Sequence, residues 1–334
     1  MLRGTNATIR KDIMAVIDEL GLVKNAPVDN YLLPKVDVDN DSGNIPVLGA
    51  NNSLQVTNTE RAADGSYQRG TWDFGADSYT CIVRGYEVTI DKISAMSNSK
   101  ILDEELVSAE IALDRVVNSR IKRVIDSVFN TTTFTGTDSY LEVTHEWDDS
   151  TNAVPKSDVN TAASYITQKT GVKKKNLSLF CNETVMENAL ATDDINSNAK
   201  YTVAIDLKSM DEKAKILATA LGIKEVVIVD SIGNDNGRGE SASFSEMAGD
   251  GQALLCLRCP ETNSFKIPGL GRQPSWSGLV RNTKGIITSK YINDVIVETY
   301  ADSEKDKIVV RAKDARDEYV NSDYGFLLDN LETT

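Results

Sequence analysis

The sequence predicts an α+β protein, and three segments of the chain support this prediction. A long amphipathic segment from Ile101 to about Asn130 indicates one extended helix. From Pro155 onward, short apolar runs alternate with helical segments, which is typical of an α/β lobe. The tail, from Ile286 to Tyr300 and again from residue 307, is rich in Val, Ile and Tyr, which favour strands. The chain has 334 residues, enough for one large domain or two modest ones.

The composition limits the classes of function. A content of 40% hydrophobic and 26% charged residues is typical of a folded protein. The net charge of -14 argues against a protein that grips nucleic-acid phosphates. No apolar run approaches the ~18 residues of a membrane span, and acidic residues interrupt the N-terminal region that a signal peptide would need to be apolar. Four cysteines do not suggest a disulfide framework, so a reducing compartment is expected.

The extended helix is predicted from one apolar stripe. Its members recur at three- and four-residue steps: Leu102, Leu106, Ala109, Leu113, Val116, Val117, Ile121, Val124 and Val128. Acidic residues at its beginning, and Arg120, Lys122 and Arg123 toward its end, complement the helix dipole. A helix of this length measures roughly 40 Å, so we expect it to act as a spine for other elements.

A hairpin is predicted from Thr57 to Phe74, because Asp64-Gly65 lies between two extended runs. Its arms are mostly polar, with Tyr67, Trp72 and Phe74 as isolated aromatic anchors. A hairpin with so little apolar surface is marginal alone. We therefore expect it to project from its own domain and rest on another surface. The next segment, residues 79–90, alternates like a half-buried strand and leads into the spine helix.

The sequence offers few groups for catalysis or metal binding. Any Ser-His-Asp or Cys-His arrangement depends on the one histidine, His145. The CxxC at residues 256–259 lacks a second ligand pair for zinc and alternates like a buried strand, so structural thiols are expected. The acidic turn at residues 37–44 lacks the acid that ends a calcium loop, since Leu48 stands there. We expect no catalytic, cofactor-binding or metal site.

A junction separates the spine region from the lobe that follows. It contains Trp147 among acidic residues and ends at Pro155, where a helix begins. Asp158 is expected to cap that helix, and Gly171 and Gly222 are expected to end helices of the lobe. No reactive group lies beside the tryptophan, so we expect it to fill space.

The order of these segments resembles that of the major capsid proteins of tailed bacteriophages, which have the Hong Kong 97-type fold. The hairpin, the spine helix and the Trp147 junction carry the resemblance, together with the strand and helix in residues 172–190 and the closing segment 323–330. The resemblance implies a domain hinge at Trp147 and Pro155. It also implies an N-terminal arm (1–54), an extended hairpin loop (55–78), a peripheral domain (79–154 and 269–334) with its spine helix (101–130), and an α/β axial domain (155–268).

The same resemblance implies a structural protein of the virion and not an enzyme. Such proteins self-assemble into the hexamers and pentamers of an icosahedral head, which is built in the bacterial host cytoplasm and encloses double-stranded DNA. Partners would be further copies of the chain, scaffold and portal proteins and, as a further class, decoration proteins; no cofactor, membrane or sequence-specific DNA contact is implied. The hairpin would supply inter-subunit contacts through Arg61, Arg69, Trp72 and Phe74.

Two features of the sequence qualify that resemblance. The region before the hairpin is too short for a large built-in scaffolding segment, so a separate scaffold or an earlier cleavage is implied. The hairpin contains no lysine, so covalent crosslinking through this segment is not expected.

Two alternatives remain open at this point. An encapsulin-like nanocompartment shell would have the same fold but enclose a cargo enzyme. A soluble α/β enzyme or ligand-binding protein would place its site near Cys256 and the polar loop 231–252. Neighbouring genes for a terminase and portal, or for a cargo enzyme, distinguish the first two. A saturable small-molecule ligand on a monomer would indicate the third.

Overall fold

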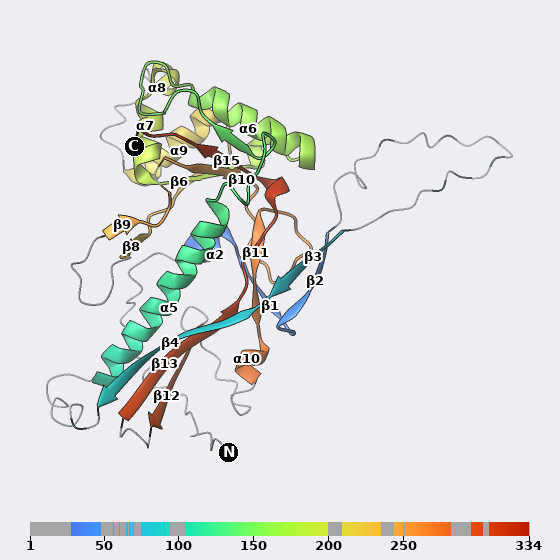
Figure 1. The fold of residues 1–334 in the computed structure, drawn as a ribbon. Coiled ribbons are helices and arrows are strands. Elements are labelled where there is room, and N and C mark those ends of the chain that lie inside the picture. Colours follow the sequence, from blue (N-terminus) through green and yellow to red (C-terminus); the bar gives the residue numbers. More distant parts are fainter. Residues whose placement is uncertain are drawn as a thin grey trace.

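The computed structural model describes residues 28–47, 75–91, 104–199, 209–234, 244–249, 251–281, 295–302 and 307–333, and the single positions 56, 60, 65, 67, 69 and 93. These residues form an elongated molecule with two parts (Figure 1). A lobe rich in helices lies at one end, and a long twisted sheet backed by one helix forms the rest. None of the helices in these ranges combines the length and apolarity that crossing a membrane requires.

The long sheet has six strands and is organised around β13. β4 pairs antiparallel with β13 along its whole length, and β12 pairs antiparallel with the other edge of β13. β11 joins the end of β13, β1 runs parallel to β11, and β14 also pairs with β11. The strands span Lys35–Val38 (β1), Ile82–Asp91 (β4), Gly271–Trp276 (β11), Ile296–Asp302 (β12), Lys307–Arg316 (β13) and Tyr319–Val320 (β14).

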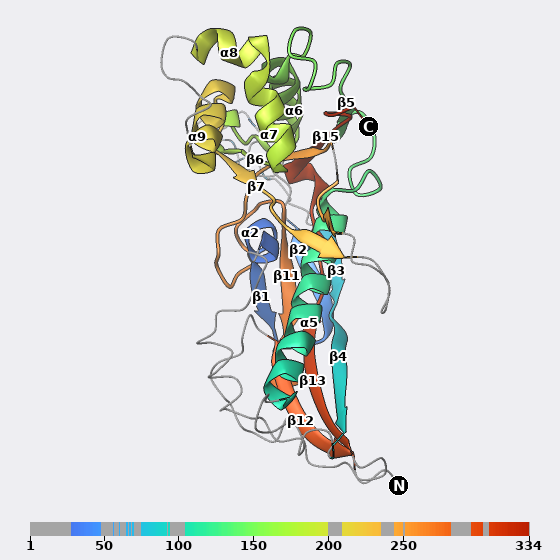
Figure 2. The same ribbon diagram turned by 90° about the vertical axis from the view of Figure 1, so that its left-hand side faces the viewer.

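The predicted spine helix is α5, Glu104–Val128, which runs along β4 and β13 (Figure 2). Its apolar stripe is buried from Ala109 to Val128, as the three- and four-residue spacing predicted. Residues 101–103 of the predicted helix lie outside the described residues. Arg120, which was expected to complement the dipole toward the helix end, is fully buried within that stripe.

The helical lobe consists of a five-stranded sheet and the helices α6 to α9. The order of strands is β5-β15-β10-β6-β7, in which β5–β15 and β6–β7 are parallel pairs. The bounds are Tyr140–Glu142 (β5), Pro155–Thr170 (α6), Ser178–Cys181 (β6), Glu183–Ala191 (α7), Asp193–Ala199 (α8), Met210–Leu221 (α9), Glu225–Ile228 (β7), Ala253–Cys256 (β10) and Gly325–Asp329 (β15). Gly171 and Gly222 end α6 and α9 in the left-handed conformation, as predicted.

Both faces of the five-stranded sheet are buried, and each face belongs to a different hydrophobic cluster. Leu179 and Leu255 face α6, α7 and α9 in the cluster of the helical lobe. Phe180 and Leu254 point the other way, into the cluster built on α5 and the long sheet. Successive side chains of a strand alternate between the two faces of a sheet, so this sheet separates two hydrophobic cores and contributes side chains to both.

The remaining elements connect these parts. They are α2 (Val28–Leu32), β2 (Ser42–Val47), β3 (Gly75–Thr80), the 3-10 turn η1 (Lys174–Asn176), β8 (Ile232–Asn234), β9 (Phe244–Glu246), the short helix α10 (Gly278–Arg281) and the 3-10 turn η3 (Ser322–Tyr324). β2 and β3 form a two-stranded antiparallel ribbon, here called the hairpin stem, and β8 pairs with β9.

Three sequence expectations differ from the structure in detail. The expected strand 79–90 is interrupted at Cys81, where the chain passes from the hairpin stem into the long sheet. In the expected strand 286–300, β12 begins at Ile296, and residues 286–294 lie outside the described residues. The predicted axial range 155–268 omits β5 and β15, which pair within the sheet of that range.

Candidate functional site

The hairpin stem is held against the body by an aromatic contact. Tyr79 of β3 stacks on Phe265, with ring centroids 6.3 Å apart and planes 20° from parallel. On the same ribbon, the backbone N–H of Cys81 donates to the carbonyl oxygen of Asp41 at 2.7 Å. The stem therefore leaves the body from a defined position, with its aromatic side chain packed on the chain itself and not on solvent.

Two hydrogen bonds join β3 to the segment that follows β13. The Tyr319 hydroxyl donates to Oδ2 of Asp77 at 2.7 Å, and the backbone N–H of Thr80 donates to Oδ2 of Asp317 at 2.8 Å. Burial raises the pKa of Tyr319, and the bond to the Asp77 carboxylate raises it further. The hydroxyl therefore stays protonated and remains a donor to the stem.

The proposed contact residues of the hairpin are only partly covered by the structure. Arg61, Trp72 and Phe74 lie outside the described residues. Arg69 is described and is exposed. Two neighbouring apolar positions are also open to solvent: Val56 is 98% and Tyr67 is 72% exposed. At these described positions, the side chains are not tucked into the core of their own chain.

Trp147 is fully buried in the cluster of the helical lobe. Its indole N–H donates to Oδ2 of Asp158 at 3.1 Å, and its backbone N–H donates to the carbonyl oxygen of Leu331 at 2.8 Å. The prediction that Asp158 caps α6 is therefore wrong. The helix begins at Pro155 with no side-chain cap, and Asp158 lies in the first turn, where its carboxylate binds the indole instead.

The environment of Asp158 works against its ionised form. Burial raises the pKa of this carboxyl, and the nearby Asp194 raises it further, while the Trp147 bond and His145 lower it. His145 itself is exposed at the surface of the junction. This arrangement buries the Trp147 ring and fixes its orientation through Asp158 and Leu331.

A buried ionic cluster connects the helix α5 to two distant segments. Arg120 Nε lies 2.6 Å from Asp29 Oδ2 of α2, and Arg120 Nη1 lies 3.7 Å from Asp314 Oδ2 of β13. Gln273 of β11 donates through Nε2 to the carbonyl oxygen of Asp29 at 3.0 Å. Sequence reasoning missed this cluster, although Arg120 occupies a position between Val117 and Val124 that the apolar stripe should have filled.

The helix α2 also contacts the helical lobe. The Tyr31 hydroxyl donates to Oε2 of Glu225 on β7 at 3.2 Å, and the Tyr31 ring meets Phe180 of β6 edge-on at 6.1 Å. The Arg258 guanidinium lies 3.3 Å from the centroid of the same ring. One five-residue helix therefore joins the spine to the lobe through side chains on both sides.

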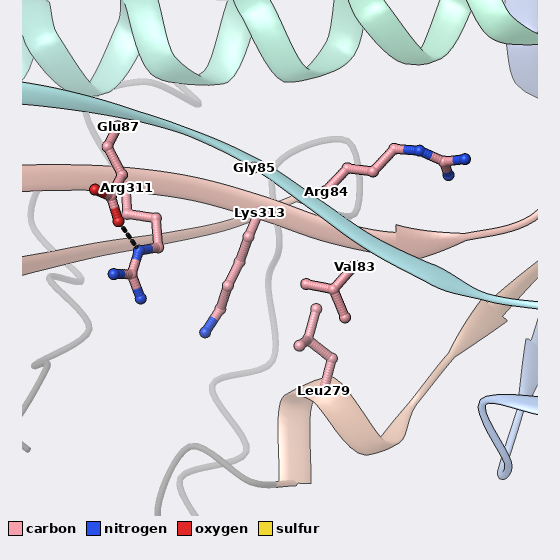
Figure 3. A pocket seen from close by; sticks show the side chains of 7 residues that line it. All are labelled: Val83, Arg84, Gly85, Glu87, Leu279, Arg311 and Lys313. Atoms are coloured by element: carbon pink, nitrogen blue, oxygen red, sulfur yellow. Dashed lines mark hydrogen bonds and ion pairs between the residues drawn. The ribbon is translucent and has the colours of Figure 1, made fainter.

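The face of the long sheet opposite α5 has an open depression (Figure 3). Arg311 Nε donates to Glu87 Oε1 across β13 and β4, and Lys313 Nζ lies 2.7 Å from Glu298 Oε1 of β12. Val83 of β4 and Leu279 of α10 point toward each other at the other end. Glu87 and Glu298 therefore compensate the charges of Arg311 and Lys313, and Arg84 lies 4.0 Å from Glu318.

The cysteines are buried and shielded from reaction. Burial raises the pKa of Cys181 and of Cys81 to about 12, and it raises the pKa of Cys256 and Cys259. Cys256 lies inside the sheet, as its alternating pattern predicted. No group of three or more metal-ligating side chains lies together in the part of the chain that the structure describes.

Several solved structures are similar to the fold of this chain, whereas the comparisons of its sequence found no match. No protein-family model and no curated protein matches the sequence. A phage-related protein from Bordetella bronchiseptica is 16% identical, with a TM-score of 0.65, over 97% of this chain and 98% of that one. The capsid of cyanophage P-SCSP1u is 8% identical, with a TM-score of 0.55, over 91% of this chain and 88% of that one.

A third match is the encapsulin SrpI from Synechococcus elongatus. It is 10% identical, with a TM-score of 0.52, over 97% of this chain and 96% of the encapsulin. At such identities, these matches establish the fold of the chain, and they do so over almost its entire length.

Proposed function

We infer from the Hong Kong 97-type capsid fold of this chain that it is a structural shell protein, namely the major capsid protein of a tailed bacteriophage. In this proposal it assembles into the hexamers and pentamers of an icosahedral head that encloses double-stranded DNA. It is part of the virion and is assembled in the host cytoplasm. The observation that carries the proposal is the extent of the structural match, which spans 97% of this chain and 98% of the phage-related protein.

The hairpin is the element that we propose to reach a neighbouring copy. Its stem is anchored through Tyr79 and Tyr319, and the described positions Val56 and Tyr67 beyond the stem are exposed. Contacts made by Arg61, Arg69, Trp72 and Phe74 would be individually weak. Many such contacts in one shell act together, because each one holds the next at high effective concentration.

In this proposal, the two parts of the molecule correspond to two domains with different roles in the shell. The helical lobe would be the axial domain around which rings form, and the long sheet with α5 would be the peripheral domain. The hinge implied at Trp147 and Pro155 would then belong to the helical lobe, since Trp147 is buried in the cluster of that lobe and Pro155 begins its helix α6. The role is structural and not catalytic.

The partners proposed for the shell are scaffold and portal proteins, with decoration proteins as a further class. The packaged DNA would be held without sequence-specific contacts. The net charge of -14 per copy supports this, because an acidic lining does not trap the phosphate backbone. We expect reversal of acidic residues on the inner surface to hinder genome packing.

A second candidate is a nanocompartment shell, because the encapsulin SrpI matches 97% of this chain with a TM-score of 0.52. The two functions differ in what the shell encloses. Particles from the native host that contain nuclease-protected DNA support the capsid, whereas particles that contain a protein cargo support the compartment.

The experiment that tests the shared proposal is electron microscopy of the purified chain, with sedimentation at increasing concentration. We expect rings of five and six copies or closed shells. A chain that stays a single copy at every concentration, with and without the products of its neighbouring genes, would contradict both candidates.

A further inference from the structure

Helix α6 crosses the helical lobe, and its two ends contact different elements. With 16 residues it is roughly 24 Å long. Its first turn lies beside α8, since the backbone N–H of Lys156 donates to Asp194 Oδ2 at 3.1 Å. Its last turn ends at Gly171 and leads into η1. The two ends of α6 therefore lie on opposite sides of the lobe (Figure 1).

Lysines gather at the C-terminal end of α6, on a surface that we name the lysine edge. It comprises Lys169, Lys173, Lys174, Lys175 and Lys224. Lys224 comes from another element, but its backbone N–H donates to the carbonyl oxygen of Leu177 at 2.9 Å, directly after η1. Lys173 and Lys175 are exposed, and neither has an ion-pair partner among the described residues.

Acids gather at the other end of α6, on a surface that we name the acidic edge. It comprises Glu146, Asp148, Asp149, Asp193 and Asp194. The backbone N–H of Asp193 donates to the carbonyl oxygen of Ser150 at 2.7 Å, which places α8 against the junction loop. Among described ion pairs, Lys156 is the cation that reaches this edge, at 3.5 Å from Asp194.

The two edges cannot neutralise each other within one chain. They are separated by the length of α6, roughly 24 Å, whereas charges in physiological salt are screened beyond about 8 Å. The dipole of α6 offers another reason for acids at its start and lysines at its end. That effect is confined to the first and last turns, so it accounts for Lys169, which also lies 3.8 Å from Asp323. Lys224 lies 3.7 Å from Glu225. Lys173 and Lys175 are left without either explanation.

We propose that the lysine edge of one copy docks on the acidic edge of the next copy, side by side around a ring. This inference rests on the proposed shell function and adds the surface that joins the lobes. Each copy would use both edges, so the contact is heterologous and a rotation between copies closes the ring. The charges would also reject an inverted neighbour, because lysine would then meet lysine.

Charge reversal of each edge provides the test. The lysine-edge variant is Lys173→Glu/Lys175→Glu, and the acidic-edge variant is Asp148→Lys/Asp193→Lys. Like charges would then face each other between identical copies. We expect the concentration needed for half-maximal ring formation to rise by about tenfold or more for each variant alone, measured by sedimentation and electron microscopy.

An equimolar mixture of the two variants restores complementary edges, but only where the variants alternate around the ring. Alternation closes in a ring of six and not in a ring of five. We therefore expect the mixture to form six-membered rings and to lack five-membered ones, which a loss of stability in either variant cannot mimic. Circular dichroism spectra of the separate variants report whether each is folded.

A matched control is Lys122→Glu/Lys266→Glu, which changes the net charge equally at two exposed or half-exposed lysines away from both edges. It should form rings like the unmodified chain.

If the lysine-edge variant also assembles normally, or if folded variants do not form rings on mixing, the docking proposal is wrong while the shell function stands. If the lysine-edge variant assembles normally but retains less nucleic acid, the edge binds nucleic acid instead. If the unmodified chain forms neither rings nor shells, both proposals fail.

Discussion

Arg120 and Asp29 form an ion pair in which neither side chain is exposed, with Nε 2.6 Å from Oδ2. The residues are 91 positions apart, and their pairing attaches α2 to the middle of the spine helix α5. Asp314 of β13 approaches the same guanidinium at 3.7 Å. Removal of one partner from such a cluster leaves a charge buried without compensation, which is more costly than the loss of a surface pair.

We expect Arg120→Ala to lower the free energy of unfolding by about 3–5 kcal/mol, because it leaves two buried carboxylates without their guanidinium. Urea unfolding of unassembled subunits, followed by tryptophan fluorescence, measures the change. The control is Lys122→Ala, which removes a half-exposed pair with Asp126 on the same helix and should cost less than about 1 kcal/mol. Equal effects of the two substitutions would mean that the buried cluster contributes no special stability.

Two substitutions at Asp158 separate its hydrogen bond from its charge. Asp158→Ala removes the acceptor of the buried Trp147 N–H and should cost about 1–2 kcal/mol. Asp158→Asn keeps an acceptor oxygen and removes the charge of the half-buried carboxylate. At pH 7 we expect it to be at least as stable as the unmodified chain, which thermal unfolding measures.

The dependence on pH follows from the raised pKa of Asp158. The native chain binds this proton more readily than the unfolded chain does, so the ionised group reduces stability above its native pKa. As the pH falls through that pKa toward the ordinary value of about 3.9, this loss is recovered. Any advantage of Asp158→Asn should therefore shrink in acid. An advantage that grows on acidification would contradict the assignment.

Tyr319→Phe removes the hydroxyl that donates to Asp77 and keeps the ring. We expect a loss of about 1 kcal/mol that is confined to the hairpin stem. Hydrogen exchange should therefore become faster at the backbone amides of β3 and stay unchanged at those of β6. Tyr165→Phe is the control, because Tyr165 stacks on Phe326 through its ring. Unaltered exchange at β3 would show that this bond does not hold the stem.

The cysteines should react only after the protein unfolds. Burial raises the pKa of all four thiols, so almost none is ionised at pH 8. We expect a thiol-specific reagent to modify none of them rapidly in the folded chain and all four in urea. Rapid modification of Cys256 and Cys259 in the folded chain would support a functional CxxC instead.

Local patterns in the sequence predicted much of the fold. The spine helix was predictable because burial of one stripe imposes a three- and four-residue spacing from Ala109 to Val128. Gly171 and Gly222 marked helix ends because the left-handed conformation there favours glycine. Cys256 was correctly expected inside a strand, since the alternation around it reflects the two faces of a sheet.

Features that depend on distant partners were not predictable. Arg120 was interpreted as one of the charges that complement the helix dipole, because nothing near it in the sequence reveals Asp29 or Asp314. Asp158 was predicted to cap the helix because aspartate is a common capping residue. The helix begins at Pro155 instead, and the Asp158 carboxylate accepts a hydrogen bond from the buried Trp147 indole. The lysine and acidic edges become visible only when α8, η1 and β7 are placed around α6.

The position of β15 within the helical lobe has a consequence for biosynthesis. β15, at residues 325–329, lies between β5 and β10 and so supplies an inner strand of a sheet whose other members are all made earlier. During translation, the lobe stays incomplete until residue 329 has left the ribosome, and its two flanking strands have no partner between them until then. A nascent chain therefore cannot complete this lobe before residues 325–329 have been synthesised.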